Sequence, residues 1–168
     1  MIEAYKDPAL APPEELPDGP EWVEQLTAFS PDDGETLASV VFTLYPHDAL
    51  PMRVYRRIVL VFDRMVAASS TTADLIGETV TALDTASPMR FRDMAESYRV
   101  AALRAIETTP GFVLLQRTAV RELYDDLEVW QTFGYEGAST HLGGYIDRGF
   151  DDLDWLPPLP DDMGRASQ

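Results

Sequence analysis

The chain contains two histidines, His47 and His141, and histidine is the side chain best suited to acid–base or metal chemistry near neutral pH. They stand 94 positions apart, and neither belongs to an HExxH or HxxxH pair. His47 follows a helix-ending proline and precedes Asp48, a setting that favours a hydrogen-bonded turn over a catalytic role. A metal site would need the fold to bring both histidines together with carboxylates. The sequence around each histidine therefore predicts neither a metal site nor an active site.

Two other suggestive motifs lie in the C-terminal fifth of the chain. Asp151-Asp152-Leu153-Asp154 lacks the glycine and the closing glutamate of a twelve-residue calcium loop, so we expect a solvated acidic edge or a contact with a partner's arginines. The glycines at 134, 137, 143, 144 and 149 neither follow a strand nor open a helix, so they match no dinucleotide or phosphate loop. The chain has no cysteine, which excludes thiolate chemistry and sulfur-ligated metals.

Aromatic residues and glycines are dense between Trp130 and Pro160, where neither helical nor strand periodicity is visible. Such a segment is too apolar for a solvated tail and has too many helix breakers for a regular element. We expect its aromatic side chains to divide between the chain's own helices and the surface of another protein. The predicted interface residues are Trp130, Phe133, Tyr135, Tyr145, Phe150 and Trp155.

Charge is concentrated at the two ends of this acidic chain, which has a formal net charge of −16. Residues 1–36 hold ten acids and one base, residues 147–168 hold six acids and two bases, and the middle is nearly balanced. Acidic ends are repelled by nucleic acid and by anionic membrane surfaces, so neither is an expected partner. A nucleic-acid mimic stays open, although such proteins usually spread carboxylates over the whole fold. No apolar run reaches transmembrane length, so we expect no membrane insertion.

The first half of the chain shows helical periodicity. A short helix around residues 21–29 is expected to place Trp22, Leu26 and Phe29 on the body. Ser30-Pro31-Asp32-Asp33 is a helix start, because serine caps, proline suits the first turn and acids face the positive helix end. The helix that follows ends at Pro46, and Pro51 opens a longer one with Asp63 and Arg56 opposite its apolar face. The expected inward residues are Leu37, Val40, Val41 and Leu44, then Val54, Ile58, Val61, Phe62 and Met65.

Three more helices complete the prediction, and no alternating strand pattern or internal repeat appears. One starts at residues 70–72, one ends near Thr109, and one starts at Pro110-Gly111. Their expected inward residues are Leu75, Ile76, Val80 and Leu83, then Tyr98, Ala102 and Ile106, then Phe112, Leu115, Ala119, Val120 and Leu123. The predicted fold is an all-α small helical bundle over residues 31–126. It lies between an extended, acidic, proline-rich arm (1–30) and an irregular arm rich in aromatics, glycine and proline (127–168).

Several short motifs, in their order and spacing, resemble the small subunit (subunit 3) family of gluconate 2-dehydrogenase and related flavin-dependent dehydrogenases. The similarity covers roughly residues 35–150. The motifs are Leu44-Tyr45-Pro46-His47-Asp48-Ala49-Leu50 with Tyr55, Thr108-Thr109-Pro110-Gly111-Phe112, Leu123-Tyr124, Val129-Trp130-Gln131-Thr132-Phe133-Gly134-Tyr135-Glu136-Gly137 and Gly143-Gly144-Tyr145.

The resemblance implies a helical, non-catalytic subunit bound to a large flavoprotein of the glucose–methanol–choline (GMC) oxidoreductase type. The cofactor, FAD, is then expected in the large subunit, which oxidises a sugar or related alcohol, and none is expected in this chain. Some such enzymes pass electrons to a cytochrome, a second implied partner. Many family members carry a twin-arginine export signal, whereas this chain begins with an acidic arm. A cytoplasmic location is therefore expected as the sequence stands, or a periplasmic one if a signal was removed or lies on a partner.

Two readings of other classes stay open beside this one. The chain could be an independent acidic binding or regulatory protein that docks on a basic partner through its ends. It could also be a small all-α enzyme that uses His47 or His141. Binding measured at high salt distinguishes the acidic binding protein from an aromatic-anchored subunit. A complex that depends on charge weakens sharply when ions screen it, whereas an aromatic-anchored complex should survive.

Overall fold

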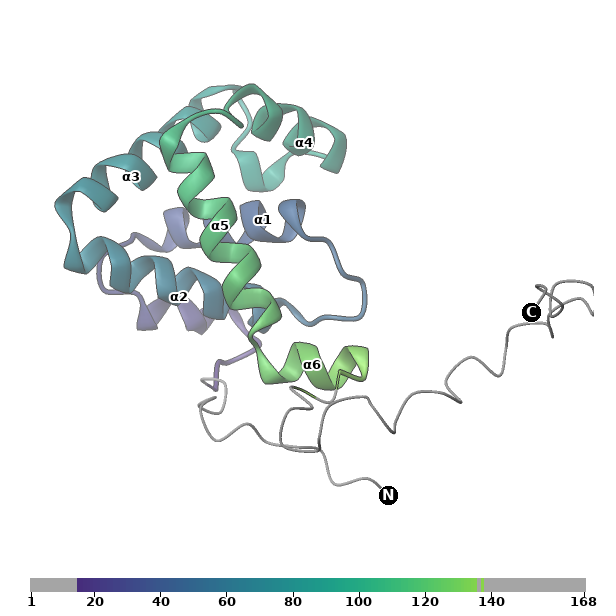
Figure 1. Cartoon of the computed structure of the whole chain (residues 1–168). Coiled ribbons are helices and arrows are strands. Elements are labelled where there is room, and N and C mark those ends of the chain that lie inside the picture. Colours follow the sequence, from purple (N-terminus) through teal and green to yellow (C-terminus); the bar gives the residue numbers. More distant parts are fainter. Residues whose placement is uncertain (1–14, 136, 138–168) are drawn as a thin grey trace, which may run out of the picture. The chain divides into compact units, whose positions relative to one another are not determined.

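The computed structural model describes residues 15–135 and residue 137, and the regular structure of this part is entirely helical (Figure 1). The all-α bundle expected from the sequence is confirmed. The elements are η1 (Pro20–Gln25), α1 (Pro31–Leu44), α2 (Met52–Ala68), α3 (Ser70–Thr85), η2 (Phe91–Asp93), α4 (Glu96–Ala105), α5 (Pro110–Tyr124) and α6 (Leu127–Phe133), where η marks a 3-10 helix.

Short polar side chains define where three of the helices begin. The hydroxyl of Ser30 accepts a hydrogen bond from the backbone N–H of Asp33, and Ser69 and Thr109 cap α3 and α5 in the same way. Pro31 and Pro110 occupy first-turn positions, where a missing N–H costs nothing. These caps are local in sequence, which is why the helix starts could be predicted.

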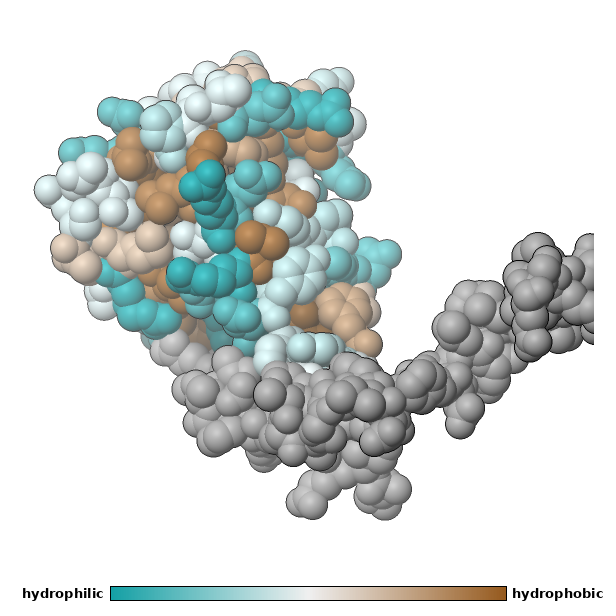
Figure 2. Space-filling view, in the orientation of Figure 1, coloured by the Kyte–Doolittle hydropathy of each residue, from teal (hydrophilic) through white to brown (hydrophobic). Residues whose placement is uncertain are grey.

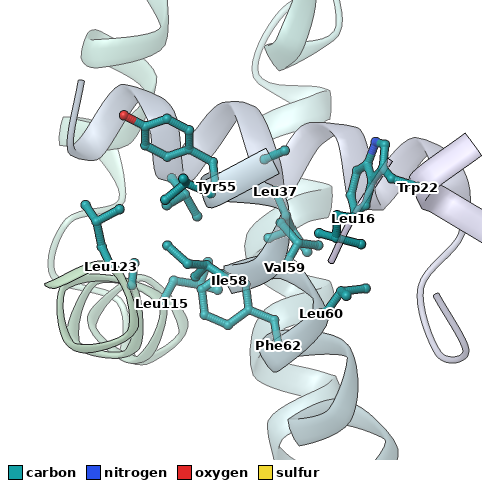
Figure 3. Packing of buried hydrophobic residues seen from close by; sticks show 14 of the residues in the cluster. Leu16, Trp22, Leu37, Tyr55, Ile58, Val59, Leu60, Phe62, Leu115 and Leu123 are labelled. Atoms are coloured by element: carbon teal, nitrogen blue, oxygen red, sulfur yellow. The ribbon is translucent and has the colours of Figure 1, made fainter. Parts of the chain in front are cut away.

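Helix α2 lies at the centre of the bundle and packs against α1, α3 and α5. Figure 3 shows Tyr55, Ile58, Val59 and Phe62 among the side chains of this core, with Leu115 and Leu123 of α5 beside them. A second cluster joins α1 to η2, α4 and α5, and its buried members are Val40, Leu83, Phe91, Leu103 and Phe112. In Figure 1, α5 runs across the bundle from the neighbourhood of α4 to α6.

The inward faces of α4 and α5 differ from the prediction at three positions. Tyr98 is 70% exposed and Leu103 is buried, so the face of α4 that meets α1 is rotated away from the predicted tyrosine. Val120, predicted inward, is 37% exposed because Ala119 and Leu123 fill the α5 contact with α2. Packing against neighbouring helices sets these orientations, and a short apolar pattern does not fix them.

Asp63, predicted to lie opposite the apolar face of α2, is buried, with 2% of its surface exposed. Its carboxylate accepts hydrogen bonds from the backbone N–H groups of Thr27, Ala28 and Phe29 and from the Thr27 hydroxyl, at 2.7–2.9 Å. Burial by itself would raise the pKa of Asp63, but these hydrogen bonds outweigh it and the pKa is lowered. The carboxylate thus holds the turn between η1 and α1.

The described part of the predicted N-terminal arm belongs to the body. Leu16 and Trp22 are buried in the main core, although Leu26 and Phe29 are only half-buried beside it. The Trp22 indole N–H donates to Glu35, 2.7 Å away, and the Arg56 guanidinium lies 5.4 Å from the centre of the indole ring. The apolar side chains among these otherwise acidic residues give the segment a place in the core. None of the described helices combines the length and apolar character needed to cross a membrane.

Candidate partner interface

Helix α6 lies inside the segment that was predicted to be irregular, so that prediction is wrong for residues 127–133. The Asp126 carboxylate accepts a hydrogen bond from the Glu128 N–H at the start of α6, and Gly134 ends the helix in a left-handed conformation with φ of 71°. An N-terminal aspartate and a C-terminal glycine are ordinary helix signals. These two signals could have predicted the helix. The prediction missed it because it was based on the density of aromatic residues and glycines in this segment.

Two arginines of α2 fix α6 to the body. The guanidinium of Arg57, only 10% exposed, donates to Asp126 at 2.7–2.8 Å and to Glu128 at 2.9 Å. Arg53 donates to the other side of Glu128 and to Asp18, which joins the N-terminal segment to the same network. Burial opposes ionisation of Glu128, but hydrogen bonds from Arg53 and Arg57 outweigh it and its pKa is lowered. Asp126 therefore both caps α6 and ties it to α2.

Side chains from α6 and from the α1–α2 turn meet at the end of α5 and form what we call the aromatic face. Edge-on contacts link the rings, with centroid distances of 6.4 Å for Tyr45–Tyr124, 5.9 Å for His47–Tyr124, 5.1 Å for His47–Phe133 and 4.9 Å for Trp130–Tyr135. The Trp130 indole N–H donates to the carbonyl of Tyr124, which joins the two halves. The aromatic face thus consists of Tyr45, His47, Tyr124, Trp130, Phe133 and Tyr135.

Tyrosine hydroxyls fix the base of the aromatic face. The Tyr55 hydroxyl accepts from the His47 backbone N–H and donates to the Tyr45 carbonyl, which holds the α1–α2 turn. The Tyr45 hydroxyl donates to the carbonyl of Gln116 on α5. Burial raises the pKa of both tyrosines, with Tyr124 adding to the effect, so both hydroxyls stay protonated and can donate. The turn that carries His47 is therefore a rigid support.

The outer side chains of the aromatic face reach solvent. Phe133 is 49% exposed, Tyr135 is 52% exposed and Tyr124 is 43% exposed, whereas Tyr45, His47 and Trp130 are half-buried behind them. In Figure 2, hydrophobic and weakly polar side chains reach the surface around α6, next to strongly hydrophilic ones along α5. Exposed rings on a fixed base are typical of a protein-binding surface.

Three of the six predicted interface residues, Trp130, Phe133 and Tyr135, lie together on this surface. Tyr145, Phe150 and Trp155 lie outside the described residues, as does His141. The interface prediction omitted Tyr45, His47 and Tyr124 because their partners are far away in sequence: 77 positions separate His47 from Tyr124. The only signal for them was their presence in the motifs that carry the family resemblance.

The one feature of this surface that resembles catalytic machinery is the contact of His47 Nε2 with the Tyr124 hydroxyl, at 3.0 Å. In the described part of the chain no carboxylate hydrogen-bonds to His47, so nothing there orients the imidazole as a base. Nor do three His, Asp or Glu side chains gather anywhere among those residues in a way that could hold a metal ion. The arrangement suits packing and recognition.

A second exposed apolar surface lies beside α4. It is a hollow of about 650 Å³ lined mainly by Ala86, Met89, Met94, Ala95, Tyr98 and Ala102. Met89 and Tyr98 are 52% and 70% exposed. No ring contacts or hydrogen-bonded tyrosines support it, in contrast to the aromatic face, as far as the described residues extend.

Comparison with models of known protein families, with curated proteins and with solved structures gave no match to this chain.

Proposed function

We propose that this chain is the non-catalytic small subunit of a heteromeric, FAD-dependent oxidoreductase of the GMC type, acting on a sugar or related alcohol. In this proposal the aromatic face binds the large flavoprotein subunit and stabilises it or assists its maturation. FAD and the substrate are bound by the partner. The observation that carries the proposal is the set of exposed aromatic rings held on a rigid base at one end of the bundle.

The energetics favour binding through these rings. A fully buried aromatic side chain removes about 150–250 Å² from water. Phe133 and Tyr135 already stand in fixed positions, so their ordering costs little when a partner covers them. Two or three such anchors, at roughly 2 kcal/mol or more each, supply most of the free energy of a stable protein complex.

The choice of partner rests on the sequence resemblance. Three of the motifs that carry it, around Tyr45-Pro46-His47, Leu123-Tyr124 and Val129–Tyr135, come together in the aromatic face. A fourth, around Pro110-Gly111, lies at the α3–α5 contact and serves packing. Motifs that converge on one exposed surface are what a shared partner would require.

The experiment is co-expression of the tagged chain with GMC-type flavoproteins of the same organism. The wild-type chain should purify with a stoichiometric flavin spectrum, and the chain expressed alone should bind no flavin. Phe133→Ala combined with Tyr135→Ala should weaken the complex by about 4 kcal/mol, or several hundredfold, while leaving the circular dichroism unchanged. The matched control, Tyr98→Ala, should bind like the wild type.

Each contrary result has a definite meaning. Stoichiometric flavin in the isolated chain would contradict a non-catalytic role. If Tyr98→Ala weakened the complex and the double variant did not, the partner would bind the α4 hollow. Loss of the complex at high salt would favour the second candidate, an acidic regulatory protein that docks on a basic partner, which the formal charge of −16 supports.

A further inference from the structure

We infer that the partner's docking surface is an apolar hollow flanked by at least two basic side chains, which pair with Asp48 and Asp125. This inference rests on the proposed function and specifies the chemistry of the partner at the aromatic face. Each carboxylate directly follows a residue of that face, His47 or Tyr124, and these two residues contact each other. The acids therefore flank the same contact.

Asp48 is exposed and stands in the turn that links α1 to α2. The turn is fixed at its start, because the His47 N–H donates to Tyr55 and the His47 carbonyl accepts from Leu50. The ring of His47 packs on Phe133, so the carboxylate one residue later lies at the border of the exposed rings. Asp48 forms no ion pair or side-chain hydrogen bond within the described part of the chain. Its only recorded electrostatic effect in the described fold is a minor contribution to the raised pKa of Tyr55, so its charge stays available for a partner.

Asp125 is exposed at the C-terminal end of α5, where the helix dipole is negative and a carboxylate is unfavourable. Arg121 is close enough for the charge of Asp125 to contribute to its raised pKa, but hydrogen bonds to Glu122 are the main cause. The guanidinium donates to Glu122 and not to Asp125. Asp125 thus stands between the negative end of α5 and the positive start of α6, and within the described residues it receives no hydrogen bond from a base.

The neighbouring acids, in contrast to Asp48 and Asp125, form ion pairs within the chain. Asp126 and Glu128 pair with Arg57, and Glu128 also pairs with Arg53, which holds α6 in place. Only Asp48 and Asp125 border the aromatic face with exposed, uncommitted carboxylates, among the residues that the structure describes. Charges at the rim of an apolar interface act mainly on the rate of encounter, whereas the buried rings determine the lifetime of the complex. A partner that uses this rim must present positive charge.

The test measures association and dissociation rates with the GMC-type flavoprotein that forms the complex, at 50 and 500 mM NaCl. Asp48→Asn combined with Asp125→Asn preserves side-chain shape and removes two charges. The matched control is Asp74→Asn combined with Glu107→Gln, two exposed acids on α3 and after α4. It removes the same total charge away from the aromatic face.

The rim variant should associate about threefold to tenfold more slowly at low salt and lose most of its salt dependence, with its dissociation rate within about twofold of wild type. The control should change by less than twofold. Equal behaviour of the two variants, or faster association of the rim variant, would overturn the basic-rim inference and leave the aromatic anchor intact. Failure of the Phe133/Tyr135 variant to weaken the complex would instead refute the binding role that the proposed function gives to the aromatic face.

Discussion

At the scale of single residues, the two buried charges of α2 have opposite signs and the same task. Asp63 receives four hydrogen bonds from residues 27–29, and Arg57 donates to two carboxylates at the start of α6. Each therefore ties the central helix to a segment that is far from it in the sequence. A buried charge with its hydrogen bonds satisfied is tolerated, whereas leaving one partner alone is costly.

Asp63→Asn should lower the free energy of unfolding at pH 7 by about 2–3 kcal/mol, because an amide cannot accept the four hydrogen bonds as a carboxylate does. The lowered pKa of Asp63 sets the pH dependence. Its stabilisation is complete above the unfolded-state pKa of about 3.9 and is lost as the pH falls through the lower folded-state value.

Urea unfolding of wild type and variant between pH 7 and pH 2.5 measures this. The difference between them should be constant above about pH 5 and should shrink below about pH 4. Asp74→Asn, a change at an exposed acid of α3, should shift the free energy by less than about 0.5 kcal/mol at pH 7. A difference between wild type and Asp63→Asn that persisted at the lowest pH would contradict the assigned cause.

At the scale of elements, glycine sets how closely α3 and α5 approach. A Cβ atom at Gly111 would lie 2.2 Å from the Thr79 hydroxyl oxygen and 2.4 Å from the Leu75 carbonyl oxygen. Gly77 is on α3 too, but a Cβ there would meet nothing within 4 Å. Gly111 is therefore required for the close contact between α3 and α5, whereas Gly77 is not.

Gly111→Ala should destabilise the chain by about 1–3 kcal/mol, since backbone atoms of α3 must move to admit the methyl group. Gly77→Ala should stabilise it by about 0.5–1 kcal/mol, because alanine favours an exposed helix interior. Chemical denaturation of both variants gives the comparison. The close approach of α3 and α5 would be refuted if Gly111→Ala were as stable as wild type.

The attachment of α6 can be tested with the two arginines of α2. Arg57→Gln leaves Asp126 and Glu128 without their buried partner and should cost about 3–5 kcal/mol. Arg53→Gln removes a more exposed pair and should cost less than about 1 kcal/mol. Amide exchange of residues 127–133 should accelerate in the first variant only. Equal protection of α6 in both variants would mean that Val129, the His47–Phe133 contact and the Trp130–Tyr124 hydrogen bond hold the helix without Arg57.

The helix starts and most inward residues could be predicted because caps and apolar spacing are local. The burial of Asp63 and Arg57 could not be predicted. Their hydrogen-bond partners lie 34–36 and 69–71 residues away in the sequence, and only the packed fold brings them together. Three of the six residues of the aromatic face were among the predicted interface residues. Trp130, Phe133 and Tyr135 were predicted as interface residues and do lie on this face, but the contribution of the α1–α2 turn depends on how that turn meets α5.

At the scale of the whole molecule, α5 connects two different surfaces. Its start lies near α4 and the second apolar hollow, and its end carries Tyr124 into the aromatic face (Figure 1). The buried core residues of the described part lie between Leu16 and Val129. Truncation after the described part therefore tests whether the stability of the body and the recognition of a partner are separate.

Deleting residues 142–168 should leave the helical body folded, with the free energy of unfolding within about 1 kcal/mol of wild type, because the core clusters formed by the described residues precede the deletion. The deletion removes Tyr145, Phe150 and Trp155, three of the predicted anchors, while Phe133 and Tyr135 stay. Binding of the proposed flavoprotein partner should therefore weaken, and Phe133→Ala with Tyr135→Ala in the truncated chain should abolish it. Circular dichroism and co-purification measure the two effects separately. If the truncated chain unfolded, the deleted segment would be part of the core. If the truncated chain bound its partner as tightly as the wild type, the aromatic face alone would form the interface.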